Sequence, residues 1–250
     1  QRQMCIRDRG DLGQSAAGKT DKNGELTVPE VEQAERHGVY IVGYTDGTFG
    51  PSRSMTRSEA AAIFARLLAE KNGDTISTAA NTKFADIPAH AWYSGYVKYL
   101  SNNGITYGKS KTIFAPNDAI TRAEFTTMAV RFFDVYGDGD AEIMEQFSGF
   151  NDVSSGYWAA EYIKYAALHG WINGYGDGSF HADREINRAE VVTIVNRLLG
   201  READEDYIAD NLRKLNTFPD VTKRHWAYYA VMEAANAHTA VLGESESWSK

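Results

Sequence analysis

Three copies of one short pattern constrain the fold of this chain more than any other feature. The pattern occupies residues 55–59 (MTRSE), and it returns at 120–124 (ITRAE) and 186–190 (INRAE). The arginines lie 65 and 66 residues apart, and a phenylalanine stands eight residues before each of them. A fixed period of this length indicates a repeat architecture, in which each unit needs a neighbour to bury its apolar face.

Each copy has the residues that begin a helix. Threonine or asparagine stands at the N-cap position, and a glutamate follows three positions later. In such a capping box the cap side chain accepts a hydrogen bond from the third N–H, while the glutamate accepts one from the cap N–H. Apolar residues then recur at helical spacing, so we predict a helix that starts at each arginine.

The arginine of each copy, Arg57, Arg122 or Arg188, contributes nothing to the cap. A cation is also unfavourable beside the positive end of a helix. Its threefold occurrence therefore indicates a partner outside the helix. Two interpretations remain open: an external anion, which the free N–H groups also favour, and a neighbouring acidic side chain.

A second element recurs with the same period and contains Trp92, Trp158 and Trp226. Each tryptophan follows a Phe-x-Asp or Phe-Pro-Asp sequence and precedes a short segment of helical periodicity. In the first two copies the segment ends at Gly104 and Gly170, as expected for a glycine C-cap. For these tryptophans the pattern favours burial in the core, with one ring edge exposed.

A turn-rich connector joins the tryptophan element to the capping-box helix. In the outer copies, 43–49 and 174–180, it reads Gly-Tyr-x-Asp-Gly-x-Phe, and Asp-Gly supplies a turn with positive φ. The middle copy, 108–114 (GKSKTIF), has neither the tyrosine nor Asp-Gly.

Each capping-box helix can be matched with one tryptophan element only if the last tryptophan element is assigned to the first repeat. The chain has three capping-box helices and three tryptophan elements, but it starts with a connector and finishes with a tryptophan element. We therefore expect segment 218–238 to pack against the first repeat and cover its helix. The predicted divisions are a leader or linker (1–36), repeat 1 (37–81), repeat 2 (82–147), repeat 3 (148–216), the closing half (217–242) and a tail (243–250).

The ends of the chain fall outside the repeat. Residues 1–9 have no periodicity and look like translated adapter sequence, so we expect them to form no part of the fold. Asn-Gly at 23–24 predicts a hairpin turn, because the first position of a competing calcium loop holds a lysine. We expect a short helix at 31–37 and a frayed tail at 243–250.

Composition excludes several functions. The net charge of −8 disfavours nucleic acid as a partner, and no apolar run is long enough to span a bilayer. The single cysteine excludes an internal disulfide. The six histidines have no metal-site spacing and Gly-x-Ser-x-Gly does not occur, so we predict no catalytic residue, no metal and no cofactor.

Together these motifs resemble the S-layer homology (SLH) family, and the resemblance covers roughly residues 37–240. It implies a mostly helical fold in which three modules form a pseudo-threefold, three-pronged assembly. It also implies a bacterial surface protein, extracellular at the cell wall or S-layer, held non-covalently to a secondary cell-wall polysaccharide that often carries pyruvate. A further domain fused at the N-terminal side is expected.

The family's sugar-binding residues can be transferred position by position. They are Arg57, Arg122, Arg188, Trp92, Trp158, Trp226, Gly43, Tyr44, Asp46, Gly174, Tyr175 and Asp177. The resemblance implies that arginine binds the pyruvyl carboxylate and that tryptophan offers an apolar plate to the sugar. Because the caps do not use the arginines, we expect alanine there to weaken binding and leave the fold intact.

The middle connector departs from the family pattern, so we expect unequal grooves. An inactive middle site is favoured over one retuned by Lys109 and Lys111, because lysine lacks fixed geometry. On this basis Arg122→Ala should matter least of the three arginine variants. Two alternatives remain: the anchoring region of a surface glycoside hydrolase or other enzyme, and a protein–protein scaffold.

Overall fold

The computed structural model describes residues 19–20, 26–27, 33–136, 147–242 and 246–249. The chain forms two units, Gln1–Gln33 and Ala34–Lys250. In the described part of the first unit, β1 (Lys19–Thr20) pairs antiparallel with β2 (Leu26–Thr27), as a hairpin requires. The predicted Asn-Gly turn lies outside the described residues.

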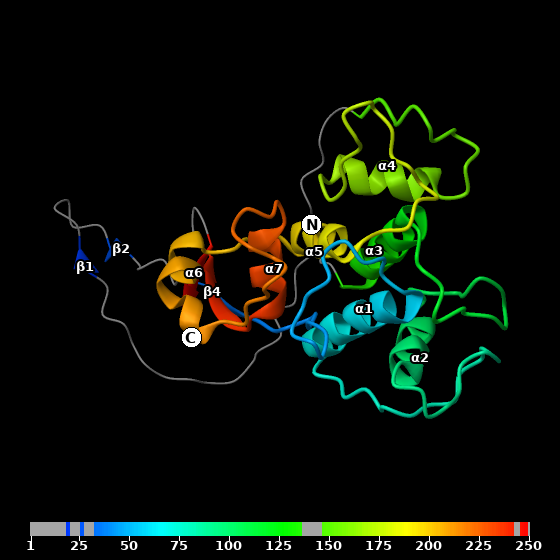
Figure 1. The fold of residues 1–250 in the computed structure, drawn as a ribbon, viewed down its shortest axis with the longest axis horizontal. Helices are drawn as coiled ribbons and strands as arrows, with labels where there is room; N and C mark the ends of the chain where they lie inside the picture. Colours follow the sequence, from blue (N-terminus) through cyan, green and yellow to red (C-terminus); the bar gives the residue numbers. More distant parts are fainter. Residues whose placement is uncertain (1–18, 21–25, 28–32, 137–146, 243–245, 250) are drawn as a thin grey trace. The chain divides into compact units, whose positions relative to one another are not determined.

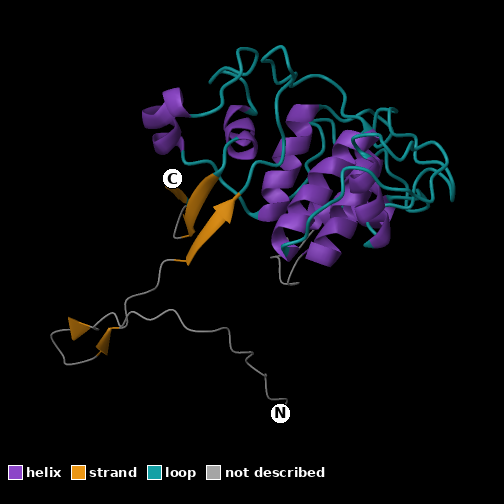
Figure 2. Cartoon of the chain, turned by 90° about the horizontal axis from the view of Figure 1, so that it is seen from below, coloured by secondary structure: helices purple, strands orange, loops and turns teal. Residues whose placement is uncertain are grey.

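The second unit is mostly helical, with long loops between short helices (Figures 1 and 2). Three helices start at the repeated arginines: α1 (Arg57–Asn72), α3 (Arg122–Tyr136) and α5 (Arg188–Leu199). Both bonds of the capping box are present at the start of each helix. The helices therefore begin where the sequence predicts.

Three shorter helices follow the tryptophans: α2 (Ser94–Asn102), α4 (Ala160–Leu168) and α7 (Tyr228–Ala235). Gly104 and Gly170 follow the first two with φ of 75° and 69°, the left-handed conformation expected of glycine at a C-terminus. Each short helix packs on one capping-box helix: α2 on α1, α4 on α3 and α7 on α5 (Figure 1). The expectation that α7 covers the first repeat's helix is wrong, because α2 packs on α1.

The closing half instead contacts the connector of repeat 1. Phe218 packs on Phe49 with ring centroids 5.3 Å apart. The Asp220 carboxylate accepts hydrogen bonds from the N–H groups of Phe49 at 2.9 Å and Gly50 at 2.7 Å. Asp86 and Asp152 make the same pair of bonds to the connectors of repeats 2 and 3. Each Phe-x-Asp motif thus holds a connector, and the last holds the first.

The three repeats meet through a cycle of main-chain hydrogen bonds. Met55 N–H donates to Ile186 C=O, Ile186 N–H donates to Ile120 C=O, and Ile120 N–H donates to Met55 C=O, at 2.9–3.0 Å. All three side chains are fully buried. The residue that precedes each N-cap therefore links its helix to the other two copies. A three-pronged shape remains a prediction.

The remaining elements are α6 (Glu205–Asn211), a 3₁₀ turn (Leu212–Lys214) and a three-stranded sheet in the order β3-β4-β5. These strands are β3 (Gln33–His37), β4 (His238–Leu242) and β5 (Ser247–Ser249). Two predictions fail here. Residues 33–37 form a strand, not a helix, and the tail pairs with β4 and buries Trp248. Within the described residues, no helix is long and apolar enough to cross a membrane.

Candidate binding grooves

Three grooves lie along the capping-box helices, each beside the connector that precedes its helix. An arginine from another copy of the motif and one exposed tryptophan complete each lining. We name the grooves by these arginines: the Arg188 groove with Trp92, the Arg57 groove with Trp158 and the Arg122 groove with Trp226. Their volumes are about 210, 100 and 240 Å³ respectively.

This assignment corrects the sequence-based ranking of the arginines. The middle connector, which contains Gly108, lines the Arg57 groove. Arg122 lines the groove of the third connector, together with Tyr175. The premise that Arg122 lies in the groove of the middle connector is therefore wrong, because each arginine reaches from its own helix to the next connector.

The three arginines are buried, with 4–5% of their surface exposed. Each Nε–H donates a 2.8 Å hydrogen bond to the carbonyl of a connector phenylalanine: Arg57 to Phe114, Arg122 to Phe180 and Arg188 to Phe49. Their guanidinium groups also lie 4.5–5.1 Å from the centroids of these phenylalanine rings. The arginines thus join consecutive repeats and form the polar base of each groove.

Each guanidinium also pairs with a capping-box glutamate. Arg57 Nη1 lies 3.1 Å from Glu124 Oε1, and Arg122 Nη1 lies 3.2 Å from Glu190 Oε1. The third pair, between Arg188 Nη1 and Glu59 Oε1, is looser at 3.8 Å. Of the two interpretations left open by the sequence, the acidic neighbour is present. Alanine at these positions would also break contacts between repeats, so an intact fold is no longer expected for those variants.

Burial affects the ionisation of these side chains. Desolvation lowers the pKa of Arg122 and Arg188, although tyrosine and glutamate neighbours act in the opposite direction. An arginine keeps its charge at neutral pH in spite of such a decrease. The lowered pKa reflects the cost of burying the cation, which the glutamate and carbonyl partners offset.

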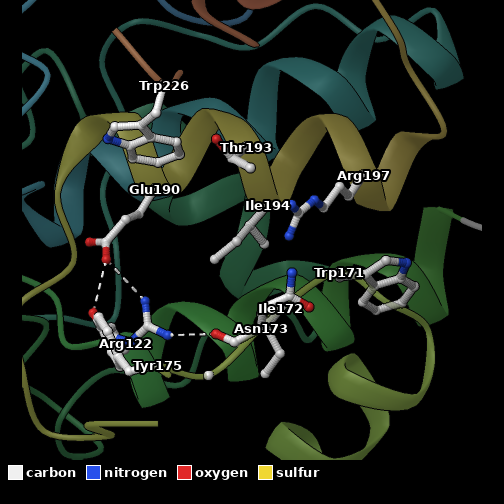
Figure 3. A pocket seen from close by; sticks show the side chains of 11 residues that line it. Arg122, Trp171, Ile172, Asn173, Tyr175, Glu190, Thr193, Ile194, Arg197 and Trp226 are labelled. Carbon is white, nitrogen blue, oxygen red and sulfur yellow. Dashed lines mark hydrogen bonds and ion pairs between the residues drawn. The ribbon is translucent and has the colours of Figure 1, made fainter. Parts of the chain in front are cut away.

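The tryptophans lie at the surface, which corrects the expectation that they belong to the core. Trp92, Trp158 and Trp226 are 52%, 56% and 65% exposed. Each stands two residues before the first residue of its helix, in the loop that leads into it. In Figure 3 the Trp226 ring lies near Glu190, at the opposite end of the groove from Arg197.

A second arginine lines every groove, and the sequence reading missed it. Arg66, Arg131 and Arg197 stand nine residues after the buried arginines, on the same helices. They are half-buried at the first two positions and exposed at the third. Their constant spacing was available in the sequence, but on a helix it is also typical of a solvated polar face. These arginines are the accessible cations of the grooves.

The connector residues divide into groove and turn positions. Tyr44 and Tyr175 line grooves, and Tyr175 donates a 3.2 Å hydrogen bond to Glu190. Asp46 and Asp177 serve the turn: each accepts from the N–H and hydroxyl two residues later, at 2.6–2.9 Å. These bonds, first those of the hydroxyls, lower the pKa of both aspartates. Neither aspartate is among the described residues that line a groove.

Gly43 and Gly174 are needed for close packing. A Cβ atom at either position would approach a phenylalanine ring carbon to 2.4 Å. The rings are those of Phe218 and Phe150, from the Phe-x-Asp motifs. The glycines therefore let the motif press against the connector beside the groove.

The Arg57 groove is the smallest of the three. Lys109 replaces the connector tyrosine and pairs with Asp118 at 2.7 Å, so its charge is directed away from the lining residues. Tyr107 lines the groove from the other side of Gly108, with the Arg131 guanidinium 4.8 Å from its ring centroid. The loop still closes without Asp-Gly, because Lys109 N–H donates to Ile113 C=O at 2.8 Å, as Tyr44 does to Thr48 at 2.7 Å.

Comparison with known proteins identifies the class. A family model described as the S-layer homology domain matches residues 24–61, 83–126 and 149–192. The second and third matches each run from a Phe-x-Asp motif to the first turn of a capping-box helix. The chain therefore belongs to the S-layer homology family, and the predicted mostly helical fold of three such repeats is confirmed.

The chain is similar to several much longer proteins of Acetivibrio thermocellus. It is 34% identical to Cell surface glycoprotein 1 over 84% of its own length and 9% of that protein. It is 29% identical to a Cellulosome-anchoring protein over 92% of its length and 49% of that protein. It is 32% identical to Exoglucanase XynX over 66% of its length and 14% of that protein. The chain thus spans less than half the length of these curated relatives.

Proposed function

We propose that this chain anchors a bacterial surface protein to the cell envelope by binding a secondary cell-wall polysaccharide, without catalysis. One observation carries the proposal: each of three grooves presents an exposed tryptophan beside two guanidinium groups. Tryptophan combines a large apolar ring with one N–H donor and is enriched at binding interfaces. The relatives named for the cell surface and for anchoring support the extracellular role.

Pyruvate ketals on the glycan match the chemistry of the grooves. A pyruvylated sugar offers a carboxylate, which accepts charge-assisted hydrogen bonds from a guanidinium. The protein as a whole carries a charge of −8 and would repel an anionic polymer, so attraction must come from local cations. The buried arginines already donate to connector carbonyls and pair with glutamates, and we assign the carboxylate contact mainly to Arg66, Arg131 and Arg197.

A sedimentation assay with purified cell walls tests the proposal. The wild-type chain should bind pyruvylated walls and lose most of that binding on chemically de-pyruvylated walls. Arg197→Ala should weaken binding by about tenfold, in line with one hydrogen bond to a charged group. Arg213→Ala removes the same charge from the exposed 3₁₀ turn and is the matched control.

Equal binding to de-pyruvylated walls would contradict the carboxylate assignment. Binding that survives removal of the whole glycan but requires wall proteins would favour the protein scaffold. The enzyme names among the relatives, an exoglucanase and an amylopullulanase, favour a second arrangement, in which this chain anchors an enzyme. A fused domain on the N-terminal side belongs to this proposal.

A further inference from the structure

Four titratable side chains of the second unit converge in a cluster that is not part of the groove linings. They are His37 at the end of β3, Glu233 in α7, His238 at the start of β4 and Glu246 just before β5. One ligand atom from each lies within 4.8 Å of the others. His37, Glu233 and His238 are 1–5% exposed. None of them has a role in the proposed glycan grooves.

The distances in this cluster are those of one face of a metal tetrahedron. His37 Nδ1 lies 3.2 Å from His238 Nε2, and each of these atoms lies 3.3 Å from Glu246 Oε1. Ligand atoms bound tetrahedrally at about 2.0–2.1 Å, as around zinc, are separated by roughly 3.3–3.4 Å. The three atoms therefore form a nearly regular triangle of the right size.

Glu233 is the fourth side chain of the cluster. Its Oε1 lies 3.3 Å from His37 Nδ1, and its Oε2 lies 3.3 Å from His238 Nε2. Neither carboxylate oxygen has a hydrogen-bond partner among the described residues, although the side chain is fully buried. A buried carboxylate without hydrogen bonds is strongly unfavourable unless a cation compensates it. Each of its two oxygens therefore lies beside one of the two histidine nitrogens.

Neighbouring groups orient His238 and Glu246, as the hydrogen-bond partners of the ligands do in metal sites. His238 Nδ1 lies 3.0 Å from the Asn236 carbonyl, and a proton donated there leaves the lone pair of Nε2 directed into the cluster. Glu246 accepts hydrogen bonds from Trp248 Nε1 at 3.0 Å and from Glu202 N–H at 2.8 Å. The Trp248 ring stacks on His238 with centroids 3.8 Å apart.

We propose that His37, Glu233, His238 and Glu246 bind one divalent transition-metal ion, zinc, in a closed four-coordinate site. Imidazole nitrogen with carboxylate oxygen suits zinc and disfavours calcium and magnesium, which prefer oxygen ligands. Four protein ligands in a buried position indicate a structural site, with no position open for substrate. The ion ties the start of repeat 1 to α7 and the C-terminal hairpin, across 201 residues between the two histidines.

Protons are the competing occupant. If both histidines are imidazolium, they neutralise the two carboxylates, although two like charges then face each other at 3.2 Å. The buried guanidinium of Arg201 adds a third cation nearby. Metal binding and protonation are distinguished by direct measurement of the metal.

The test uses the full chain, stripped with a chelator and titrated with Zn²⁺ or Co²⁺ at neutral pH. We expect one equivalent of Zn²⁺ to bind and to raise the midpoint of thermal unfolding. Bound Co²⁺ should show the intense visible absorption of tetrahedral coordination and should be displaced by Zn²⁺. Glu233→Gln should weaken metal binding by at least about tenfold. His90→Ala, an exposed histidine outside the cluster, should bind like the wild type.

Wild-type results alone can overturn the proposal. A chain that binds less than a stoichiometric amount of Zn²⁺, or whose unfolding midpoint is the same with and without the ion, has protons in the cluster. Weak, six-coordinate Co²⁺ spectra would also contradict it. If Glu233→Gln does not fold, Glu246→Gln takes its place, because Glu246 is more accessible. Unchanged Zn²⁺ affinity in either folded variant would exclude the cluster as the site.

Discussion

Each capping-box glutamate uses one oxygen for the cap of its own helix and the other for an arginine from another copy of the motif. Glu124 Oε2 accepts from the N-cap N–H of its own helix, and Oε1 pairs with Arg57 of the preceding copy. The sequence predicts the first contact, because capping depends on local spacing. It leaves the second open, because the arginine arrives from a helix 65 residues away. One residue type thus starts a helix and joins two repeats.

Glutamine at position 124 should separate these two roles. It can still complete a capping box, but it removes the charge that faces the buried Arg57 guanidinium. We expect Glu124→Gln to lower the free energy of unfolding by about 1–2 kcal/mol, and Glu124→Ala by about 1 kcal/mol more. Chemical denaturation measures both. Glu161→Gln, exposed in α4, is the control, and an equally small effect for Glu124→Gln would mean that the ion pair adds nothing.

A backbone constraint follows the buried phenylalanine of every connector. Gly50, Ala115 and His181 hold this position with φ of 67°, 58° and 54°. Side chains other than glycine pay about 1–2 kcal/mol in this left-handed region. Ala115→Gly should therefore raise the free energy of unfolding by about 0.5–1 kcal/mol, after the entropy that glycine adds to the unfolded chain. Ala89→Gly, in an exposed loop outside this region, should lower it, and a decrease for both would contradict the argument.

At the scale of elements, the sequence predicts the helices that recur in each repeat and misses the strands that occur only once. The helices that start at the arginines, the short helices after the tryptophans and the glycine stops all follow from local spacing. Strand β3 (Gln33–His37) could not be found in this way, because it owes its conformation to β4 (His238–Leu242) at the other end of the chain. The exposed tryptophans were misjudged because periodicity shows helicity but not whether another element covers a given side.

The last Phe-x-Asp motif should stabilise the first connector as the others stabilise theirs. Asp220→Ala removes a carboxylate that accepts two hydrogen bonds from main-chain N–H groups 170 or more residues away. We expect a loss of about 1.5–3 kcal/mol in the free energy of unfolding, similar to that for Asp86→Ala. Asp210→Ala, exposed in α6, should change it by less than about 0.5 kcal/mol. If Asp220→Ala matches this control, the last half-repeat does not hold the first.

The equivalent contact made by Asp152 in repeat 3 should contribute to the stability of the protein in acid. Burial raises the pKa of Asp152, but hydrogen bonds from the N–H groups of Phe180 and His181 lower it by more than burial raises it. The folded pKa therefore lies below the usual value. Its contribution is therefore present above the unfolded pKa of about 3.9 and is lost as the pH falls through the folded pKa. Acid titration of Asp152→Asn should show a shallower loss of stability below about pH 4 than the wild type. Identical acid limbs would contradict this.

At the scale of the whole molecule, the even count of half-repeats predicts a closing contact, and the structure shows how it is made. The main-chain hydrogen bonds of Met55, Ile120 and Ile186 join all three copies of the motif. The Asp220 carboxylate of the last half-repeat then binds the connector of the first repeat. The sequence predicts that closure but not which helices pair, since α7 packs on α5. It also predicts most groove residues, yet misassigns the arginines, because each reaches across a boundary between repeats. The cluster around His37 escapes sequence reading altogether, since no motif spans its four elements.

Unequal grooves should give unequal binding sites. The Arg57 groove has less than half the volume of either other groove, and the cation of Lys109 is paired with Asp118. We therefore expect a calorimetric titration with a short pyruvylated glycan to show fewer than three equivalent sites. Trp92→Ala and Trp226→Ala should each weaken one strong site by about tenfold, because a buried aromatic contact is worth about 1.5–3 kcal/mol. Trp158→Ala should change the titration least.

The tryptophan variants suit this comparison better than the arginine variants. All three indole rings are more than half exposed, so alanine there removes groove surface and leaves the contacts between repeats in place. Val135→Ala, an exposed apolar side chain of α3 outside the grooves, controls for loss of surface area. The free energy of unfolding of each variant should match that of the wild type within about 0.5 kcal/mol. If Trp158→Ala abolishes most of the binding while the other two variants bind normally, the small groove is the principal site, and volume does not decide which groove takes the glycan.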